Sequence, residues 1–327
     1  KLFTKAVILI SLFFITYIHL VFFTPPTAIA IVECLFFGGL IAAIGFNIMH
    51  DGSHGSFSKY AWLNKLASSS ISILGASRFM WSMKHVSIHH TYTNVDGVDD
   101  DIEIGVFMRM APTQKWYKAH KFQHIYSVLL YGLLTINWAI TTDFLQMKRY
   151  MERKLSYGKF PSPFLNWSKL VISKVIYLSL WIALPMLILD VAWYKILFGF
   201  FIMHYTAGLI LSIVFQLAHV MDEAEMPMPE IDGTMKNTWA IHQLKTTVNF
   251  SPKNRLVNWF TGGLNHQVEH HIFPNISHIH YGKIAEIVKK TAKEFNLPYN
   301  EFETTRKAII AHFKYLKEMG VKPVLQA

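Results

Sequence analysis

The stretch AIAIVECLFFGGLIAAIGFNIMHDGSH, residues 28–54, joins a long apolar segment to a pair of histidines. Residues 28–49 contain one charged side chain, Glu33, and are long enough to cross a bilayer, which takes about 20 residues of helix. His50 and His54 follow directly. Positions i and i+4 of a helix share one face, so their imidazoles lie within reach of a common metal ion. The stretch therefore predicts a membrane helix that ends in half of a metal site.

Three further segments are apolar enough and long enough to span a membrane. They are residues 6–23, about 170–189 and about 194–218. Only 16% of the chain is charged, against about one quarter in soluble domains. Pro25 and Pro26 turn the first segment directly into the second without a small-residue cleavage site, which favours a span over a secretory signal. The sequence predicts an all-α integral membrane protein, a single domain over 1–327, with four transmembrane helices in two hairpins.

Basic residues predict which side of the membrane the large polar segments occupy. Of the 31 Lys and Arg, 14 lie in 50–169 and 13 in 219–327, whereas the loops 24–27 and 190–193 have none. The positive-inside rule therefore places both large segments in the cytoplasm, where we expect them to form a helical cap. We expect a multi-pass protein of a bacterial inner membrane or of the endoplasmic reticulum. The net charge of +10 follows this membrane pattern, so we expect no nucleic-acid partner.

Two shorter apolar stretches, 62–76 and 125–142, complicate the count of spans. If 125–142 alone also crossed, the two basic segments would end on opposite sides. We therefore expect both stretches to lie in the membrane interface or to pack beneath the spans. The single cysteine, Cys34, excludes disulfides and any iron-sulfur cluster or zinc site built from several thiolates.

Seventeen histidines are many for this length, and several fall just beyond predicted span ends. The candidate metal ligands are His50, His54, His85, His89, His90, His219, His270 and His271. One zinc ion takes four ligands at most, or three and water, so this set suits two ions with about four or five nitrogen ligands each. Imidazole binds iron, zinc, copper or nickel, so the ligand type alone does not choose the metal.

A histidine pair at this spacing also arises without a metal, as His120 and His124 illustrate. His204 lies 15 residues before His219, about 22 Å along a helix, and cannot join the same centre. We expect His204 and His19 to be packed or hydrogen-bonded within spans. Structural or solvated roles are expected for the remaining four, His242, His278, His280 and His312.

The segment NHQVEHH, residues 265–271, leaves open which residue joins the pair His270 and His271. With about 100° per helical residue, Gln267 points nearly along the midpoint of the pair and His266 is swung aside. Yet His85 stands to His89 and His90 as His266 stands to this pair, so the two choices conflict unless the segments differ in backbone shape. Glu269 is expected beside the metal ligands or at the surface.

Acidic residues near the histidines are candidates to orient them. A metal-bound histidine usually donates its second ring N–H to a carboxylate or carbonyl. Asp51, Asp99, Asp100 and Asp101 stand close in sequence to the first two histidine groups. The alternative for the last three is that they solvate a loop.

Three segments together resemble the histidine boxes of membrane fatty-acid desaturases. They are HDGSH, WSMKHVSIHHTYTNVDGVDDDIEIG and GGLNHQVEHHIFPNISHIHYGKIAEIVKKT, in this order. The resemblance runs from about residue 35 to 320 and is closest to the front-end and bacterial acyl-CoA or acyl-lipid branch. In that branch glutamine opens the third box, which favours Gln267 over His266. Three residues separate His85 from His89 where front-end members usually have two, so the position of the double bond stays open.

The resemblance implies a non-haem centre of two iron ions, held mainly by histidine on the cytoplasmic side, with His219 among the ligands. It would use dioxygen to introduce a cis double bond into the acyl chain of an acyl-CoA or acyl-lipid held in an apolar tunnel. The sequence has no HPGG haem motif, so we expect a separate electron donor, either ferredoxin or cytochrome b5 with its reductase.

Two other functions compete with desaturation. The same scaffold carries hydroxylases, epoxygenases and ketolases, since an oxidant that has removed hydrogen can return oxygen to the carbon. A membrane metal transporter is a rival of another class, and it predicts ionisable residues in the middle of several spans. The four spans offer little more than His19, Glu33 and His204, which favours an enzyme.

Overall fold

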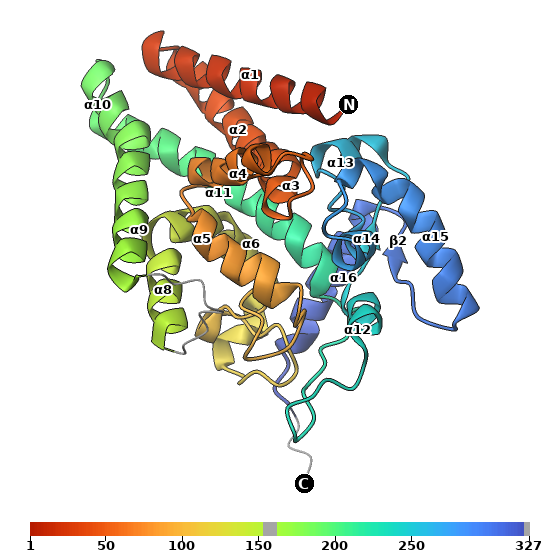
Figure 1. Cartoon of the computed structure of the whole chain (residues 1–327). Helices are drawn as coiled ribbons and strands as arrows, with labels where there is room; N and C mark the ends of the chain where they lie inside the picture. The colour runs from red at the N-terminus through yellow and green to blue at the C-terminus, as the bar shows by residue number, and fades with distance from the viewer. Residues whose placement is uncertain (153–161, 324–327) are drawn as a thin grey trace.

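The computed structural model describes residues 1–152 and 162–323 (Figure 1). Within them, four helical segments are long and apolar enough to cross a membrane. They are α1 (Leu2–Phe22); α2 (Thr27–Ile44), which continues through a π-helical turn into α3 (His50–Ser53); α9 (Pro163–Leu178), which continues likewise into α10 (Leu184–Ile188); and α11 (Trp193–His219). The prediction of a helical membrane protein with four spans is confirmed.

The third span begins earlier than the predicted residue 170. Ser162 is its N-cap, with a side-chain oxygen that accepts a hydrogen bond from the backbone N–H of Leu165, and Pro163 occupies the first turn. Both are favoured helix-start residues. Lys174 does not interrupt the span, because its ammonium group is buried 2.6 Å from the carboxylate of Asp143 and donates to the backbone carbonyl of Trp138. The hydropathy pattern missed this beginning because Asn166 and Lys169 interrupt the apolar pattern of its first two turns.

The chain between the two hairpins forms a bent helical segment instead of a fifth straight span. Residues Lys118–Gly132 and Leu134–Glu152 meet at 57°. This bent segment contains α6 (Gln123–Gly132), α7 (Leu134–Asn137) and α8 (Asp143–Glu152), with a π-helical turn, Trp138–Thr142, before α8. In Figure 1, α8 lies beside α9, against which it packs, while α6 and α7 pack against α11.

The bend lies beside the middle of α11, which corrects the expectation for 125–142. Thr135 donates a hydrogen bond to the carbonyl oxygen of His204, about 22 Å along the helix from His219. The stretch therefore packs between spans and not beneath them. The backbones of the bent segment and α11 can approach closely because Gly132 and Gly208, which have no side chains, face each other. The other stretch, 62–76, is short: α4 (Ala61–Ser69) and a 3₁₀ turn follow α3 and pack against it, as expected for a stretch at the end of a span.

The remaining elements form a cap around one end of α11, opposite to α10 (Figure 1). They are α5 (Arg78–Trp81), the π-helix Ser82–His89, α12 (Trp239–Thr246), β1 (Asn249–Phe250), α13 (Arg255–Phe260), α14 (Gln267–Ile272), α15 (Tyr281–Glu294), β2 (Glu301–Phe302) and α16 (Thr305–Met319). The two short strands pair in parallel, with Asn249 opposite Glu301 and Phe250 opposite Phe302. This pairing holds the chain after α12 against the chain before α16.

We predict that Gly208→Ala loosens the bent segment from α11. A Cβ atom at this position would lie 2.6 Å from the backbone oxygen of Gly132, which cannot move without shifting the helix. Overpacking of this kind costs about 1–3 kcal/mol of unfolding free energy. Thermal unfolding in detergent measures the loss. Gly39→Ala is the matched control, because nothing lies within 4 Å of its added Cβ; equal melting temperatures for the two variants would contradict the prediction.

Candidate metal centre

Four segments distant in the sequence bring histidines to one place at the cap end of the spans. His50 and His54 stand on the continuous helix from α2 to α3, with ring centroids 4.7 Å apart. His85 and His89 belong to the π-helix Ser82–His89, which His90 directly follows. His219 is the last residue of α11, and the pair His270 and His271 lies on α14. All eight side chains are buried.

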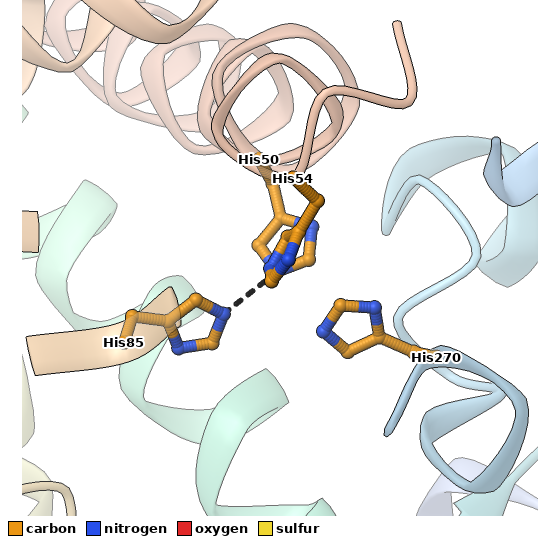
Figure 2. Close-up of side chains that lie close together, drawn as sticks. All are labelled: His50, His54, His85 and His270. Carbon is orange, nitrogen blue, oxygen red and sulfur yellow. Dashed lines mark hydrogen bonds between the residues drawn. The ribbon is translucent and has the colours of Figure 1, made fainter. Parts of the chain in front are cut away.

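The first group of histidines surrounds a common space, as Figure 2 shows. His50 and His54 enter it from one helix end, His85 from the π-helix and His270 from the opposite side. Each of the four can place a ring nitrogen within 4.8 Å of the others. The Nε2 atoms of His50 and His85 are 3.0 Å apart. This is the spacing of nitrogens around a single metal ion with bonds of about 2.0–2.1 Å.

A second group adjoins the first. His89, His219 and His271 also place ring nitrogens within 4.8 Å of one another. His90 lies between the two groups, with its ring centroid 4.6 Å from that of His270 and 4.3 Å from that of His271. The eight predicted histidines are thus arranged as a group of four, a group of three and one residue that adjoins both.

Several buried ring nitrogens of these groups have no hydrogen-bond partner among the described residues. They are His54 Nε2, His85 Nδ1, both ring nitrogens of His90, His270 Nε2 and His271 Nε2. A buried polar atom left unpaired costs about 1–3 kcal/mol, so such a cluster is unfavourable unless something binds it. Metal ions satisfy this need, and the residues present therefore fit a metal centre.

Burial also sets the protonation state that metal binding requires. Desolvation lowers the pKa of His54 to about 3, and it lowers the pKa values of His85, His90 and His270 well below the ordinary value. Neighbouring imidazoles add to the effect, because they disfavour a second positive charge. A histidine ligand must be neutral, so these rings are ready to bind without first losing a proton.

The outer nitrogens of the clustered rings are held by groups that sequence spacing did not indicate. His271 Nδ1 lies 2.8 Å from the amide oxygen of Gln243, and His270 Nδ1 lies 3.2 Å from the hydroxyl of Tyr281. His219 Nδ1 lies 3.2 Å from the backbone oxygen of Thr246. Such contacts fix the orientation of a ligating ring. Gln243 and Thr246 are on α12, which carries no predicted ligand.

Asp99 is the carboxylate that contacts the candidate ligand His89. It is buried and accepts a hydrogen bond from His89 Nδ1 at 2.9 Å, so the alternative of a solvated loop is wrong for this residue. Burial by itself lowers the pKa of His89, but Asp99 and Asp101 outweigh it and raise that pKa. Asp101 lies 3.4 Å from the same nitrogen and also pairs with Lys84.

The other two predicted acids have different partners. Asp51 contacts His278 Nδ1 at 2.9 Å and the hydroxyl of Ser277 at 3.0 Å. Its carboxylate therefore faces away from the candidate ligands, because the residue after His50 projects about 100° around the helix, toward the turn that precedes α15. The carboxylate of Asp100 binds Arg149 and Tyr150 of α8.

The two double-histidine segments differ in backbone shape, which removes the conflict left by the sequence. His85 belongs to a π-helix, whereas His266 precedes α14 with non-helical angles, φ −109° and ψ 62°. The His266 ring faces Asn258 at 3.3 Å and Glu269 at 3.6 Å, and it belongs to neither histidine group. Gln267 is the first residue of α14 and is buried. Glu269 is buried too, and it accepts hydrogen bonds from Asn249 and Tyr299.

The remaining histidines lie outside the groups, as predicted. His120 contacts the backbone of Val106 and Tyr117, and His242 contacts the carbonyl oxygen of Thr93. The other partners are Glu33 for His19, Thr135 and Tyr177 for His204, Lys5 and Asp51 for His278, and Tyr131 and Val220 for His312.

Several known proteins are similar to this chain in amino-acid sequence. A family model described as fatty acid desaturase matches residues 26–303. An sn-1 linoleoyl-lipid 6-desaturase of Arthrospira platensis is 36% identical over 90% of this chain and 79% of its own length. One of the same description from Synechocystis sp. is 32% identical over 98% and 89%. An acyl-lipid (8-3)-desaturase of Physcomitrium patens is 35% identical over 97% of this chain, which spans 66% of that relative. The chain therefore belongs to the fatty acid desaturase family of membrane oxidoreductases.

Proposed function

We propose that this protein is an acyl-lipid desaturase, which introduces a cis double bond with a histidine-held pair of iron ions and dioxygen. The observation that supports it most is the pair of adjoining histidine groups with buried ring nitrogens that have no hydrogen-bond partner among the described residues. The relatives described above are named for action on linoleoyl-lipids and acyl-lipids, which favours a lipid-bound acyl chain over a coenzyme A thioester. Desaturation and hydroxylation differ in whether the product gains oxygen, so mass spectrometry of the product separates them.

The two groups correspond to two ions in this proposal. His50, His54, His85 and His270 would hold one ion, and His89, His219 and His271 the other. His90 lies against both groups and would complete either. Gln267 is a candidate weak ligand, or a hydrogen-bond partner of a ligand. A set built almost entirely from imidazole is compatible with iron.

Iron and dioxygen would supply the oxidising power, because an unactivated methylene gives a side chain no proton or leaving group to act on. The chain's own part is to place the right carbon beside the centre. A cavity of about 660 Å³ reaches His89 and His219, and Trp138 and Phe215 line its wall. These apolar walls would exclude water and hold the acyl chain in a fixed position, which is how geometry contributes to rate.

The cap would face the cytoplasm, where the positive-inside rule places segments 50–169 and 219–327. The same side would give a ferredoxin, or cytochrome b5 with its reductase, access to the cap. An electron donor is required because reducing dioxygen to water takes four electrons and a desaturation releases only two.

We predict that His270→Ala abolishes the double bond. His270 contributes to the first group and also adjoins His90, so its loss would disturb both ions. The measurement is the fatty-acid profile of a host that expresses the chain, normalised to the amount of protein. His120→Ala should retain most of the product, since its ring bonds only backbone atoms. Product from the first variant, or equal loss from both, would refute the ligand assignment.

We expect Asp99→Asn to weaken iron binding by about 10–100-fold, the usual effect of removing the partner of a metal-bound histidine. The substitution keeps the shape of the side chain but removes the charge that faces His89 Nδ1. Iron retained against a graded chelator measures the affinity. Asp100→Asn is the matched control, because that carboxylate binds Arg149 and Tyr150. The same loss in the control would show that the charge of the loop, not the contact, is responsible.

The ranking of Gln267 over His266 has its own test. Gln267→Ala is expected to lower the rate of desaturation by about tenfold or more, as loss of a ligand or its partner does. His266→Ala should have a smaller effect, because its ring faces Asn258 and Glu269. Rates are compared per amount of iron-loaded protein. The reverse order would place His266 at the metal.

A further inference from the structure

The cavity that reaches the histidines also has an open side. One wall is α11, with Ser212, Phe215 and His219, and the facing wall is the bent segment, with residues from Leu130 to Arg149. The loop Ile102–Phe107 closes part of the space between them. The cavity therefore lies in the angle of the bent segment, between it and α11.

Apolar side chains that point outward surround this opening. Ile140 is 55% exposed, Leu145 63% and Phe107 62%, and all three line the cavity. The bend lies beside His204, in the middle of the fourth span. Exposed apolar side chains at the depth of a span contact lipid and not water. One side of the opening therefore faces the bilayer.

The end of the cavity beside His89 is charged, with more acids than bases. Asp100, Asp101 and Glu103 line it together with Lys84 and Arg149. Both bases are already paired, Lys84 with Asp101 and Arg149 with Asp100. Of the described residues that line the cavity, none leaves a cation free to bind the phosphates of coenzyme A. A polar head without negative charge suits this end.

We propose that the opening between the bent segment and the loop Ile102–Phe107 is a lateral entrance from the membrane. A bilayer lipid enters through it with an uncharged polar head at the acidic end, and its acyl chain runs from there past His219 and along Trp138 and Phe215. This rests on the proposed function for the reaction that follows, but the binding step needs neither iron nor dioxygen.

Photolabelling of the iron-free chain in phosphatidylcholine vesicles tests the entrance directly. The probe is a glucosyl diacylglycerol with a diazirine in one acyl chain. Saturable labelling of the peptides that contain residues 130–145 and 212–219 is expected, and it should fall with unlabelled glucosyl diacylglycerol but not with oleoyl-CoA. Labelling that is not saturable, or that oleoyl-CoA removes equally well, would overturn the proposal. Because turnover is not needed, a chain that binds the probe but forms no double bond would refute only the proposed function.

A pair of variants locates the entrance. Ile140→Asp puts a carboxylate at the lipid-facing rim, where charge is strongly disfavoured, and should lower the saturable labelling by at least about tenfold. Leu129→Asp is the matched control, because Leu129 is also 55% exposed on the bent segment but does not line the cavity. Its labelling should stay within about twofold of the unaltered chain. Equal losses would argue against an entrance at Ile140, and labelling of the unaltered chain decides the proposal if Ile140→Asp does not fold.

Discussion

Eight buried imidazoles meet at one place, and five of them have ring nitrogens without a hydrogen-bond partner among the described residues. Such nitrogens are unfavourable in a dry interior unless a metal ion occupies the space between them. Four segments, from His50 to His271, must therefore meet at one point, and the spans and cap are arranged to make them do so. The span from α2 to α3 continues as an unbroken helix past Met49, which places His50 and His54 at fixed positions beyond its apolar part.

Orientation of the rings comes from a second layer of contacts supplied by the cap. Asp99, Gln243, Tyr281 and the backbone of Thr246 each hold the outer nitrogen of one imidazole. These groups keep the inner lone pairs directed at a common space even without a metal ion. Since Gln243 and Thr246 lie on α12, which carries no candidate ligand, α12 must pack in the cap before His271 and His219 are fully oriented.

The bent segment packs against the spans and lines the cavity that reaches the histidines. It packs between α9 and α11 because glycines allow close backbone approach and because the pair Asp143 and Lys174 neutralises the charges that this depth would otherwise penalise. Its angle leaves room for the cavity that ends at His89 and His219. A straight helix would fill that angle, so the bend makes the space that the cavity occupies.

Hydropathy and helical spacing were enough to locate the four spans and the histidines that gather at their ends, because both are local properties of the chain. The sequence also indicated Asp99, which lies ten residues after its partner His89. Only the tertiary structure decided which histidines share a group, that Asp51 turns to His278, and that 125–142 inserts beside α11. It also showed that the backbone is π-helical at His85 and non-helical at His266. These features depend on contacts between segments up to about two hundred residues apart, and spacing along one helix carries no information about them.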